Sequence, residues 1–517
     1  MPSAEPGDPT PSLPPTAEAA AADAHLRVDD IAADLRSRTI RSGVLQMVAQ
    51  GVQLLLLVGS ALVLARLLTP DDFGVAAMVS TVAALVMGVR DFGFPFAAVQ
   101  REALDQRNVS ALFWLSVRLN LLLSAGTMVL APLLARFYGE PRVLLVTIVW
   151  SVGSFFGSVT ALHEGLLVRR MRFAALRVVE IGSLVVGIAV GIALAWMGFG
   201  YWALVYQTFV GFVARAVLAW FVTGWRPTSF REVAAERGRA LRALLHYGRD
   251  VTGARLLTFV SQNTDQLVVG RAFGAAALGL YDNAYRWSLY PAQQVFLPLS
   301  HVAISALSRL QGSPGIFRSA FRQAVLPYLA VSVPGFVFLV IQAEVVIPAL
   351  LGERWRGAVP FFRVLCLAAL VRAYSRPTSW LYLSEGRTRP ALHFAALSTP
   401  LMLAAVIAGA RWGAIGVAYG FTLGTLLLTL PEIAWCLRGS RVRASDFVAA
   451  CWRPTLAALA AGAALVAALP RMDALGRWPL VLASLAVFGV AYVATWLVLP
   501  GGWRTTRELA EFRKAMG

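Results

Sequence analysis

Charged residues are scarce in this chain of 517 residues: they make up 14% of it, whereas hydrophobic residues make up 58%. A soluble domain carries roughly 25% charged residues, so the composition excludes an ordinary soluble protein. Cysteine is also rare, and Cys366, Cys436 and Cys451 all lie within or beside apolar runs. No disulfide framework of the kind found in small secreted domains can be read from them. The composition predicts a polytopic membrane protein.

Acidic residues are outnumbered by basic ones, and the net charge of +18 raises the question of a nucleic acid partner. The Arg residues stand singly or in threes between apolar runs, which is typical of loops in membrane proteins and not of a nucleic-acid surface. A Gly-rich phosphate loop ending in Lys and Ser or Thr is absent. No two His residues have the spacing of metal ligands. We therefore expect no nucleic acid partner, no metal and no cofactor.

Apolar segments of about 20 residues, the length that crosses the hydrocarbon core, recur along the chain. Residues 1–40 hold no such run and are expected to form a disordered cytoplasmic tail. The seventh segment is polar enough for a hydropathy plot to miss it. The 14 expected spans lie near residues 43–66, 73–97, 110–134, 143–163, 174–197, 200–222, 248–272, 279–306, 320–350, 358–382, 391–410, 413–437, 447–469 and 478–499.

The loops between these spans differ in charge on the two sides of the membrane. One set of alternate loops holds 25 Lys and Arg residues and the other holds 8. Because basic loops stay in the cytoplasm, both termini are expected there, including a tail at 500–517. The basic set includes a connector at 223–247 whose apolar side chains oppose Arg231, Arg237, Arg239 and Arg242, so we expect an interfacial helix on the cytoplasmic leaflet.

An internal repeat with an offset of 205 residues divides the chain. Residues 41–79 match the stretch at 245–285, with Gly43 on Gly248, Arg66 on Arg271 and Gly74 on Gly279. Each copy is an apolar helix that ends in Arg, followed by a short turn and a Gly that opens the next helix. Internal repeats are how many transporters are built. The expected fold is therefore all-α, with six-helix lobes at 41–222 and 248–437 related as repeats, plus two helices in 438–499.

Six stretches in a fixed order resemble the bacterial polysaccharide and lipid-linked oligosaccharide flippases of the multidrug, oligosaccharidyl-lipid and polysaccharide exporter superfamily. The resemblance covers residues 35 to 440, and the order of the motifs is more specific than any one of them. The stretches are ARLLTPDDFG at 65–74, DFGFPFAAVQRE at 91–102, EGLLVRRMRF at 164–173, GFGYWALVYQ at 198–207, NTDQLVVGRAFGAAALGLYDNAY at 263–285 and GERWRGAVPFFRVLCL at 352–367.

This resemblance implies two lobes around a central cavity that opens alternately to each side of the bacterial inner membrane. It also implies the substrate, an undecaprenyl-diphosphate-linked oligosaccharide repeat unit that is moved outward. The implied partners are this lipid-linked substrate, membrane lipids, a polysaccharide polymerase and glycosyltransferases. With no nucleotide-binding motif on the chain, transport is expected to run on a gradient or on substrate flux.

Arginines within the expected spans are the candidates for holding a diphosphate, because the guanidinium fork pairs with phosphate oxygens. Snorkelling or structural pairing, for instance of Arg90 with Asp91 or of Arg177 with Glu180, is the alternative. Depth divides the candidates into two groups. Arg118, Arg286 and Arg372 lie near the midplane, and Arg90, Arg215, Arg255 and Arg376 lie nearer the cytoplasm.

A polar face on the seventh span is the second candidate site. Arg255, Thr258, Gln262, Asp265 and Gln266 follow helical spacing, so they share one face that is expected to look into a cavity. Asp265 with Asn263 and Gln262 offers a carboxylate and amide oxygens, which suit a coupling proton or sodium ion. The same groups would equally suit an interhelical hydrogen-bond cluster that fixes packing.

Two other functions compete with a flippase. A drug or small-molecule antiporter of the same superfamily is disfavoured by the intramembrane Arg residues, which would repel organic cations. A membrane polysaccharide polymerase or ligase resembles chains with a large extracytoplasmic loop, whereas the longest outer loop expected here has only a few residues. The sequence thus favours a transporter with no catalytic residues.

Overall fold

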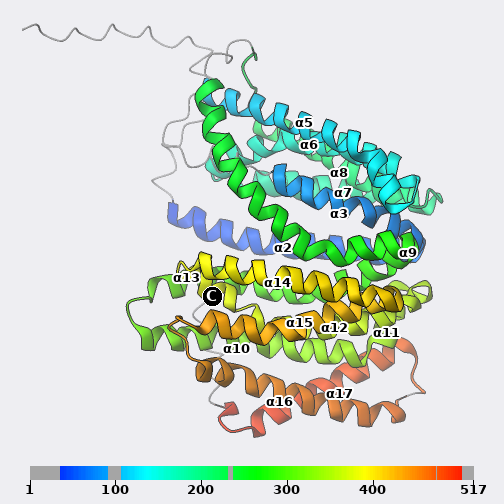
Figure 1. The fold of residues 1–517 in the computed structure, drawn as a ribbon, viewed down its shortest axis with the longest axis vertical. Coiled ribbons are helices and arrows are strands. Elements are labelled where there is room, and N and C mark those ends of the chain that lie inside the picture. Colours follow the sequence, from blue (N-terminus) through cyan, green and yellow to red (C-terminus); the bar gives the residue numbers. More distant parts are fainter. Residues whose placement is uncertain (1–34, 91–105, 231–236, 473, 504–517) are drawn as a thin grey trace, which may run out of the picture.

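The computed structural model describes residues 35–90, 106–230, 237–472 and 474–503. This part of the chain is built of helices and contains no strand, which confirms the all-α class (Figure 1). Ten helical segments within it are long and apolar enough to cross a membrane, so the expected total of 14 is approximate. Residues 1–34 and 504–517 of the two expected tails lie outside the described residues.

Six helices precede residue 230 and gather at one end of the molecule, the upper part of Figure 1. Each follows one of the six expected N-terminal spans, because a span's hydropathy is a local property of the sequence. Short turns join α5 to α6 and α7 to α8, so these pairs pack antiparallel. The helices are α2 (Leu35–Leu67), α3 (Pro70–Arg90), α5 (Gln106–Tyr138), α6 (Arg142–Arg169), α7 (Phe173–Trp196) and α8 (Trp202–Thr223).

Helix α9 (Arg237–Arg309) covers the seventh and eighth expected spans and has two arms. The arms meet at Gly274, whose φ of 81° is a backbone conformation that favours glycine. Residues 224–229 are not helical and 231–236 lie outside the described residues, so the connector contributes its last part, from Arg237, directly to the first arm. Within the described residues, α9 contributes no segment to the set of apolar helices.

The remaining helices fill the other end of the molecule. Two expected spans are interrupted: 320–350 at Gln342, and 358–382 at Arg376 and Pro377. Proline lacks the N–H of a helical hydrogen bond, which explains the second interruption. These helices are α10 (Pro314–Ile341), α11 (Ala343–Leu351), η3 (Glu353–Ala358), α12 (Val359–Ser375), α13 (Thr378–Ser384), α14 (Thr388–Gly409), α15 (Gly413–Leu437), α16 (Ala444–Ala468) and α17 (Arg477–Val498).

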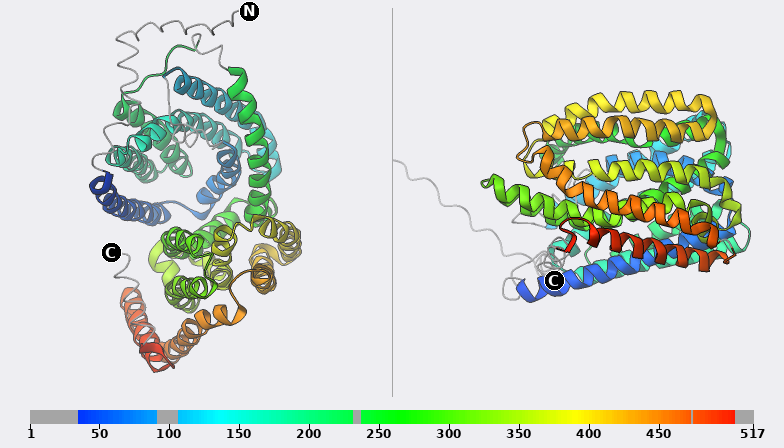
Figure 2. Two further views of the ribbon diagram at one scale, coloured as in Figure 1. Left: turned by 90° about the vertical axis from the view of Figure 1, so that its left-hand side faces the viewer. Right: turned by 90° about the horizontal axis from the view of Figure 1, so that it is seen from below.

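Helices α16 and α17 pack on one another and on α10, on the side away from α2–α8 (Figure 2). They follow the two expected additional spans. The boundaries of the two lobes, of the connector and of the tails stay predictions.

The repeat produces a symmetric contact between α3 and the second arm of α9. A Cβ added to Gly74 would lie 1.7 Å from the carbonyl oxygen of Ala275, and one added to Gly279 would lie 1.8 Å from that of Pro70. Pro70 and Ala275 are themselves separated by the repeat offset. Each glycine therefore contacts, in the other copy of the repeat, the residue four positions before the other glycine. Only glycine permits so close an approach of two backbones.

Three hydrogen bonds join the described residues before 230 to those after 275, and all lie at the end of the bundle that carries η3, here called the Trp355 end. Trp355 Nε1 donates to the Ala65 carbonyl at 2.7 Å. Arg66 donates to the Ala349 carbonyl at 3.1 Å, and Arg354 donates to that of Leu67 at 3.3 Å. The Trp355 end thus ties the two halves together, and Thr81 on α3 adds a further bond to Gln266 on the first arm of α9, at 3.1 Å.

A charged cluster strengthens the same end within the first half. Arg142 Nη1 lies 2.6 Å from an Asp71 oxygen, and its Nε lies 2.8 Å from Glu140. The side-chain hydrogen bond from Arg142 lowers the pKa of Glu140, in the turn between α5 and α6. These bonds hold the start of α3 against that turn.

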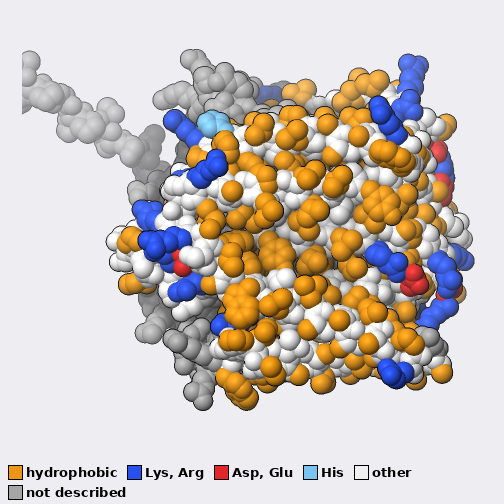
Figure 3. Space-filling view, turned by 60° about the horizontal axis from the view of Figure 1, so that its bottom comes forward, with side chains coloured by type: hydrophobic (Ala, Val, Ile, Leu, Met, Phe, Trp, Pro, Cys, Tyr) orange, Lys and Arg blue, Asp and Glu red, His pale blue; other side chains and the backbone are white. Residues whose placement is uncertain are grey.

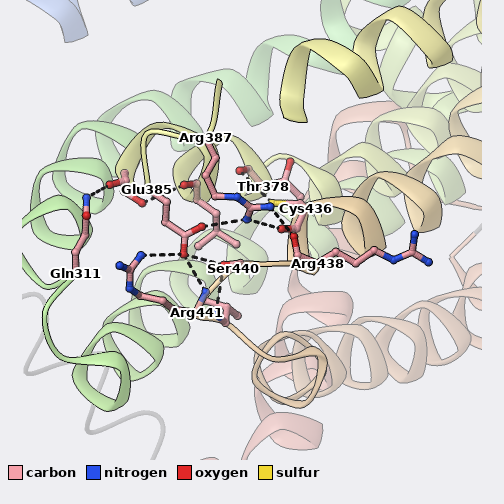
Figure 4. A network of polar contacts seen from close by, with 11 residues as sticks. Gln311, Thr378, Glu385, Arg387, Cys436, Arg438, Ser440 and Arg441 are labelled. Carbon is pink, nitrogen blue, oxygen red and sulfur yellow. Dashed lines mark hydrogen bonds and ion pairs between the residues drawn. The ribbon is translucent and has the colours of Figure 1, made fainter. Parts of the chain in front are cut away.

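The opposite end, here called the Glu385 end, holds a network that joins the α13–α14 turn to the end of α15 (Figure 4). The Glu385 side chain is only 1% exposed. It accepts hydrogen bonds from the Ser440 hydroxyl and the Arg441 backbone N–H, both at 3.0 Å, and from Arg387 at 3.2 Å. Arg387 also donates to the Cys436 carbonyl at 2.9 Å. The buried carboxylate has its hydrogen-bond partners within the protein, so we interpret this network as one that stabilises the fold.

The surface fits a bilayer. Hydrophobic side chains cover the middle of the face in Figure 3, and Arg side chains gather at its two edges. Large apolar side chains such as Leu133, Leu430 and Val490 are more than half exposed in the isolated chain. Lipid tails would cover such a band, so the arrangement supports a multi-pass membrane protein.

Candidate substrate cavities

A polar cavity of about 370 Å³ opens where the span at 358–382 is interrupted; we call it the Arg372 cavity. Arg376 and Pro377 keep helical backbone angles, so α12 gives way to α13 here without a sharp break. Hydroxyl groups, two guanidinium groups and one carboxylate line it. Its polar and aromatic lining consists of Phe296, Arg372, Ser375, Arg376, Thr378, Ser379, Phe394, Ser398, Phe421, Thr425, Thr429 and Glu432.

Helical spacing explains how these groups converge. Arg372 and Arg376 are four positions apart at the end of α12, so they lie on one face. One face of α15 likewise carries Thr425, Thr429 and Glu432. Thr378 and Ser379, which follow Pro377 at the start of α13, line the same cavity.

Neither guanidinium in this cavity forms an ion pair with a described carboxylate. Arg376 lies 5.2 Å from the ring centre of Phe296, and Arg372 lies 6.0 Å from that of Phe421. Glu432 instead accepts a hydrogen bond from Thr378 at 3.3 Å. Arg372 also hydrogen-bonds to the Tyr285 side chain. With no described carboxylate to neutralise them, both guanidinium groups can attract an anion.

A second polar cavity, of about 410 Å³, lies between α2, α7 and α8; we call it the Arg215 cavity. Its charges are paired. Arg215 makes a forked contact with Glu164, at 2.6 and 3.0 Å, and lies 4.0 Å from Glu180. Arg177 is hydrogen-bonded to Glu180, which confirms the pairing expected from the sequence. The polar lining also includes Gln53, Ser183, Gln207 and Thr208.

A third cavity, of about 210 Å³, adjoins the second; we call it the Arg286 cavity. It lies between α3, α6, α8 and the second arm of α9, and it shares Gln207 and Thr208 with the Arg215 cavity. Arg286 is paired with Asp282 at 2.9 Å. The two cavities share only these two lining residues, most of the lining of the Arg286 cavity is apolar, and the arginines in both cavities are paired with carboxylates.

Asp265 is 2% exposed and accepts a hydrogen bond from the Tyr281 hydroxyl at 2.6 Å, across the two arms of α9. Its neighbour Gln266 bonds to Asp282 at 3.3 Å and to Thr81 at 3.1 Å. These contacts match the interhelical hydrogen-bond cluster named as one of the two alternatives. Asn263 is half-buried on the same arm, and the side chain of Gln262 lies outside the described residues.

Comparison with known proteins fits this architecture. A model of the polysaccharide biosynthesis protein family matches residues 63–360, more than half of the chain. The chain belongs to this family.

Two relatives of this family member are a lipopolysaccharide biosynthesis protein and a transport protein. The lipopolysaccharide biosynthesis protein WzxC of Escherichia coli K12 is 22% identical over 81% of this chain and 85% of its own length. The succinoglycan biosynthesis transport protein ExoT of Rhizobium meliloti is 26% identical over 61% of this chain and 63% of its own. A solved structure of the lipid II flippase MurJ, in an inward closed conformation, has a TM-score of 0.68 at 12% identity, covering 87% of this chain and 98% of that one. The MurJ match shows a shared fold.

The structure separates the arginines that the sequence proposed for this family member's substrate. Arg372 and Arg376 share a cavity, whereas Arg286 and Arg215 lie in the other two and are paired with carboxylates. Arg118 is exposed on α5, with its guanidinium carbon 3.7 Å from the ring centre of Phe230. The side chains of Arg90 and Arg255 lie outside the described residues.

Sequence reasoning missed the hydroxyl side chains of the Arg372 cavity. A signal was present in the run Ser375, Arg376, Pro377, Thr378 and Ser379, because a proline flanked by hydroxyls inside an apolar span marks a polar break. The spacing of the α15 residues was a second signal. Neither alone tells which cavity a side chain lines, since that depends on packing between distant helices.

Proposed function

We propose that this protein translocates undecaprenyl-diphosphate-linked oligosaccharide repeat units, the precursors of an exopolysaccharide or lipopolysaccharide, across the bacterial inner membrane by alternating access. The observation that carries the proposal is the Arg372 cavity, where two arginines without a described carboxylate partner lie among hydroxyl groups at the junction of α12 and α13. Such a site suits an anionic, oxygen-rich head group. The protein is a transporter and not an enzyme, in keeping with its family.

Deletion of the gene tests this function. We expect the deletion strain to keep making lipid-linked saccharide and to accumulate it on the cytoplasmic side, while the exported polymer is lost. Membranes of the two strains should be extracted and the lipid-linked saccharide quantified. A deletion strain that makes no lipid-linked saccharide at all would point to a synthetic enzyme, and one that exports normally would remove the protein from this route.

A drug antiporter of the same superfamily is the alternative. The guanidinium groups of Arg372 and Arg376 argue against it, because they would repel the organic cations that such antiporters carry.

The Glu385 end is proposed to be the cytoplasmic one. Helix α2 begins and α17 ends on that side of Figure 1, and the loops there belong to the basic set. A single Cys placed at Arg237, where α9 begins, is expected to resist an impermeant thiol reagent in intact cells and to react after permeabilisation. A Cys at Arg411, in the turn between α14 and α15 at the Trp355 end, is the matched position expected to react in intact cells. The reverse pattern would invert the topology.

Asp265 is proposed as the coupling residue, with Asn263 and Gln262 as further ligands for a proton or sodium ion. Arg372 acts electrostatically on both Asp265 and Glu432, so charge at Asp265 is felt in the Arg372 cavity. Asp265→Asn keeps the size and an acceptor for the Tyr281 hydroxyl but loses the charge. We expect normal abundance with export reduced at least about tenfold. Tyr281→Phe, which removes the hydrogen bond alone, is the control; export by Asp265→Asn at the wild-type rate would confine Asp265 to packing.

A further inference from the structure

We infer that the space formed by the adjoining Arg215 and Arg286 cavities is a subsite for the uncharged saccharide part of the substrate, separate from the diphosphate site in the Arg372 cavity. This inference rests on the proposed function. It assigns the two ends of one substrate to two chemically different cavities.

Charge separates the two sites. In the first-half cavities the three arginines are each paired with a carboxylate: Arg177 with Glu180, Arg215 with Glu164 and Arg286 with Asp282. An anion entering there would have to compete with the carboxylate already paired with each guanidinium, which weakens its binding. A neutral group rich in hydroxyls meets no such penalty, because it can both donate to the carboxylates and accept from the guanidinium groups.

Gln207 supplies a polar side chain that both cavities share, with its carbonyl oxygen packed against Gly191 of α7, 2.5 Å from where a Cβ of that glycine would lie. It lies on α8 and lines both cavities. Its side-chain carbonyl oxygen is buried and has no hydrogen-bond partner. A buried acceptor without a donor is costly and is expected to be satisfied by a ligand or by water. Beside it, Thr208 adds a second polar side chain to both linings.

Glycines give the space its shape. Gly187 and Gly211 line the Arg215 cavity on α7 and α8, where the two backbones pack closely: a Cβ added to Gly187 would lie 2.7 Å from the Gln207 backbone carbonyl oxygen. A Cβ added to Gly211 would meet nothing nearer than the Ser183 carbonyl oxygen at 3.9 Å, so the room at this position is real. The Arg215 cavity, at about 410 Å³, lies within the range of ligand pockets, roughly 300–1,000 Å³, and the Arg286 cavity, at about 210 Å³, lies below it.

The second arm of α9 connects the two sites. It contributes Asp282 and Arg286 to the first-half space and Phe296 to the Arg372 cavity. Arg286 and Phe296 are ten positions apart on this arm, about 15 Å along the helix axis. One extended substrate, with its diphosphate at one site and its outer sugars at the other, would span that distance.

Binding to purified protein in nanodiscs tests the division with two probes. The first is undecaprenyl diphosphate, and the second is the lipid-linked saccharide extracted from the deletion strain. Gln207→Leu is expected to weaken binding of the second probe about tenfold and to leave binding of the first unchanged. Gly211→Leu, which fills the Arg215 cavity, is expected to do the same, whereas Gly211→Ala is the matched control that fits without contact. Arg372→Ala is expected to weaken binding of both probes.

The outcomes separate the inference from the proposed function. Wild-type protein that binds neither probe would overturn the proposed function. Wild-type protein that binds both probes, with Gln207→Leu and Gly211→Leu affecting both equally or neither, would overturn the saccharide subsite alone. Thermal unfolding of each variant in the same nanodiscs identifies any that fail to fold, and the Gln207 and Gly211 variants provide two independent routes to the answer.

Discussion

Replacing both Arg372 and Arg376 with alanine is expected to abolish export while leaving the protein abundant in the membrane. Each charge-assisted contact to a phosphate oxygen contributes about 1.5–3 kcal/mol, which is about ten- to a hundredfold in affinity. Neither arginine forms an ion pair with a described carboxylate, so their removal strands no partner charge. The single variants are expected to lose about tenfold or more, and the double variant at least about a hundredfold.

Lysine variants and a distant arginine sharpen this test. Lys keeps the charge but loses the planar fork, so Arg372→Lys and Arg376→Lys should fall between the wild type and the alanine variants. Arg389→Ala removes an exposed cation from the start of α14, outside the cavity lining, and should export normally. Export is measured at matched membrane abundance. If the double alanine variant exports at the wild-type rate, the diphosphate is bound elsewhere, with Arg118 and Arg286 the next candidates.

The second large effect is expected at the crossing of α3 with α9. Gly74→Ala places a Cβ 1.7 Å from a backbone carbonyl oxygen, which no rotamer change can relieve. The two helices must move apart, and overpacking of this kind costs about 1–3 kcal/mol or more. Because the crossing adjoins the Trp355 end, we expect that end to fail to close and export to be lost.

Gly279→Ala should reproduce the defect, since the contact is symmetric. Gly335→Ala is the matched control: it lies within α10 with open space around it, and alanine should stabilise the helix by about 0.5–1 kcal/mol. Thermal unfolding in detergent and export at matched abundance are the measurements. Normal export by both Gly74→Ala and Gly279→Ala would mean that the crossing opens without consequence for transport.

The elements of the fold were largely predictable because a membrane imposes a local rule. A segment spans if about 20 consecutive residues are apolar, and no knowledge of its neighbours is needed. The repeat was also readable, since Gly74 and Gly279 match in sequence before they meet in space. The interruptions at Gln342 and at Pro377 were less accessible, because prolines are tolerated within membrane helices when neighbouring groups satisfy the freed carbonyls.

The candidate sites were only partly predictable, because the partner of a charged side chain is a tertiary property. Arg286 and Asp282 are four positions apart on one helix, so their pairing was available to sequence reasoning and was overlooked. Arg215 and Glu164 are 51 positions apart, and nothing in the sequence indicates that they meet. Arg372 and Arg376 are distinguished by having no ion pair with a described carboxylate. This property can be recognised only when the positions of the carboxylates in the fold are known.

The bonds that tie the two halves together at the Trp355 end share a chemical property with a consequence for energy coupling. Their donors are guanidinium or indole N–H groups and their acceptors are backbone carbonyls. None of these groups changes its protonation state near neutral pH. These three bonds therefore stabilise the joined state of the Trp355 end by a few kcal/mol, at about 0.5–1.5 kcal/mol per bond, independently of pH. A proton gradient would therefore have to shift the conformational equilibrium through groups that lie elsewhere in the protein. A difference of about 5.5 kcal/mol in binding free energy between the two conformations would suffice to reverse a hundredfold preference for one of them.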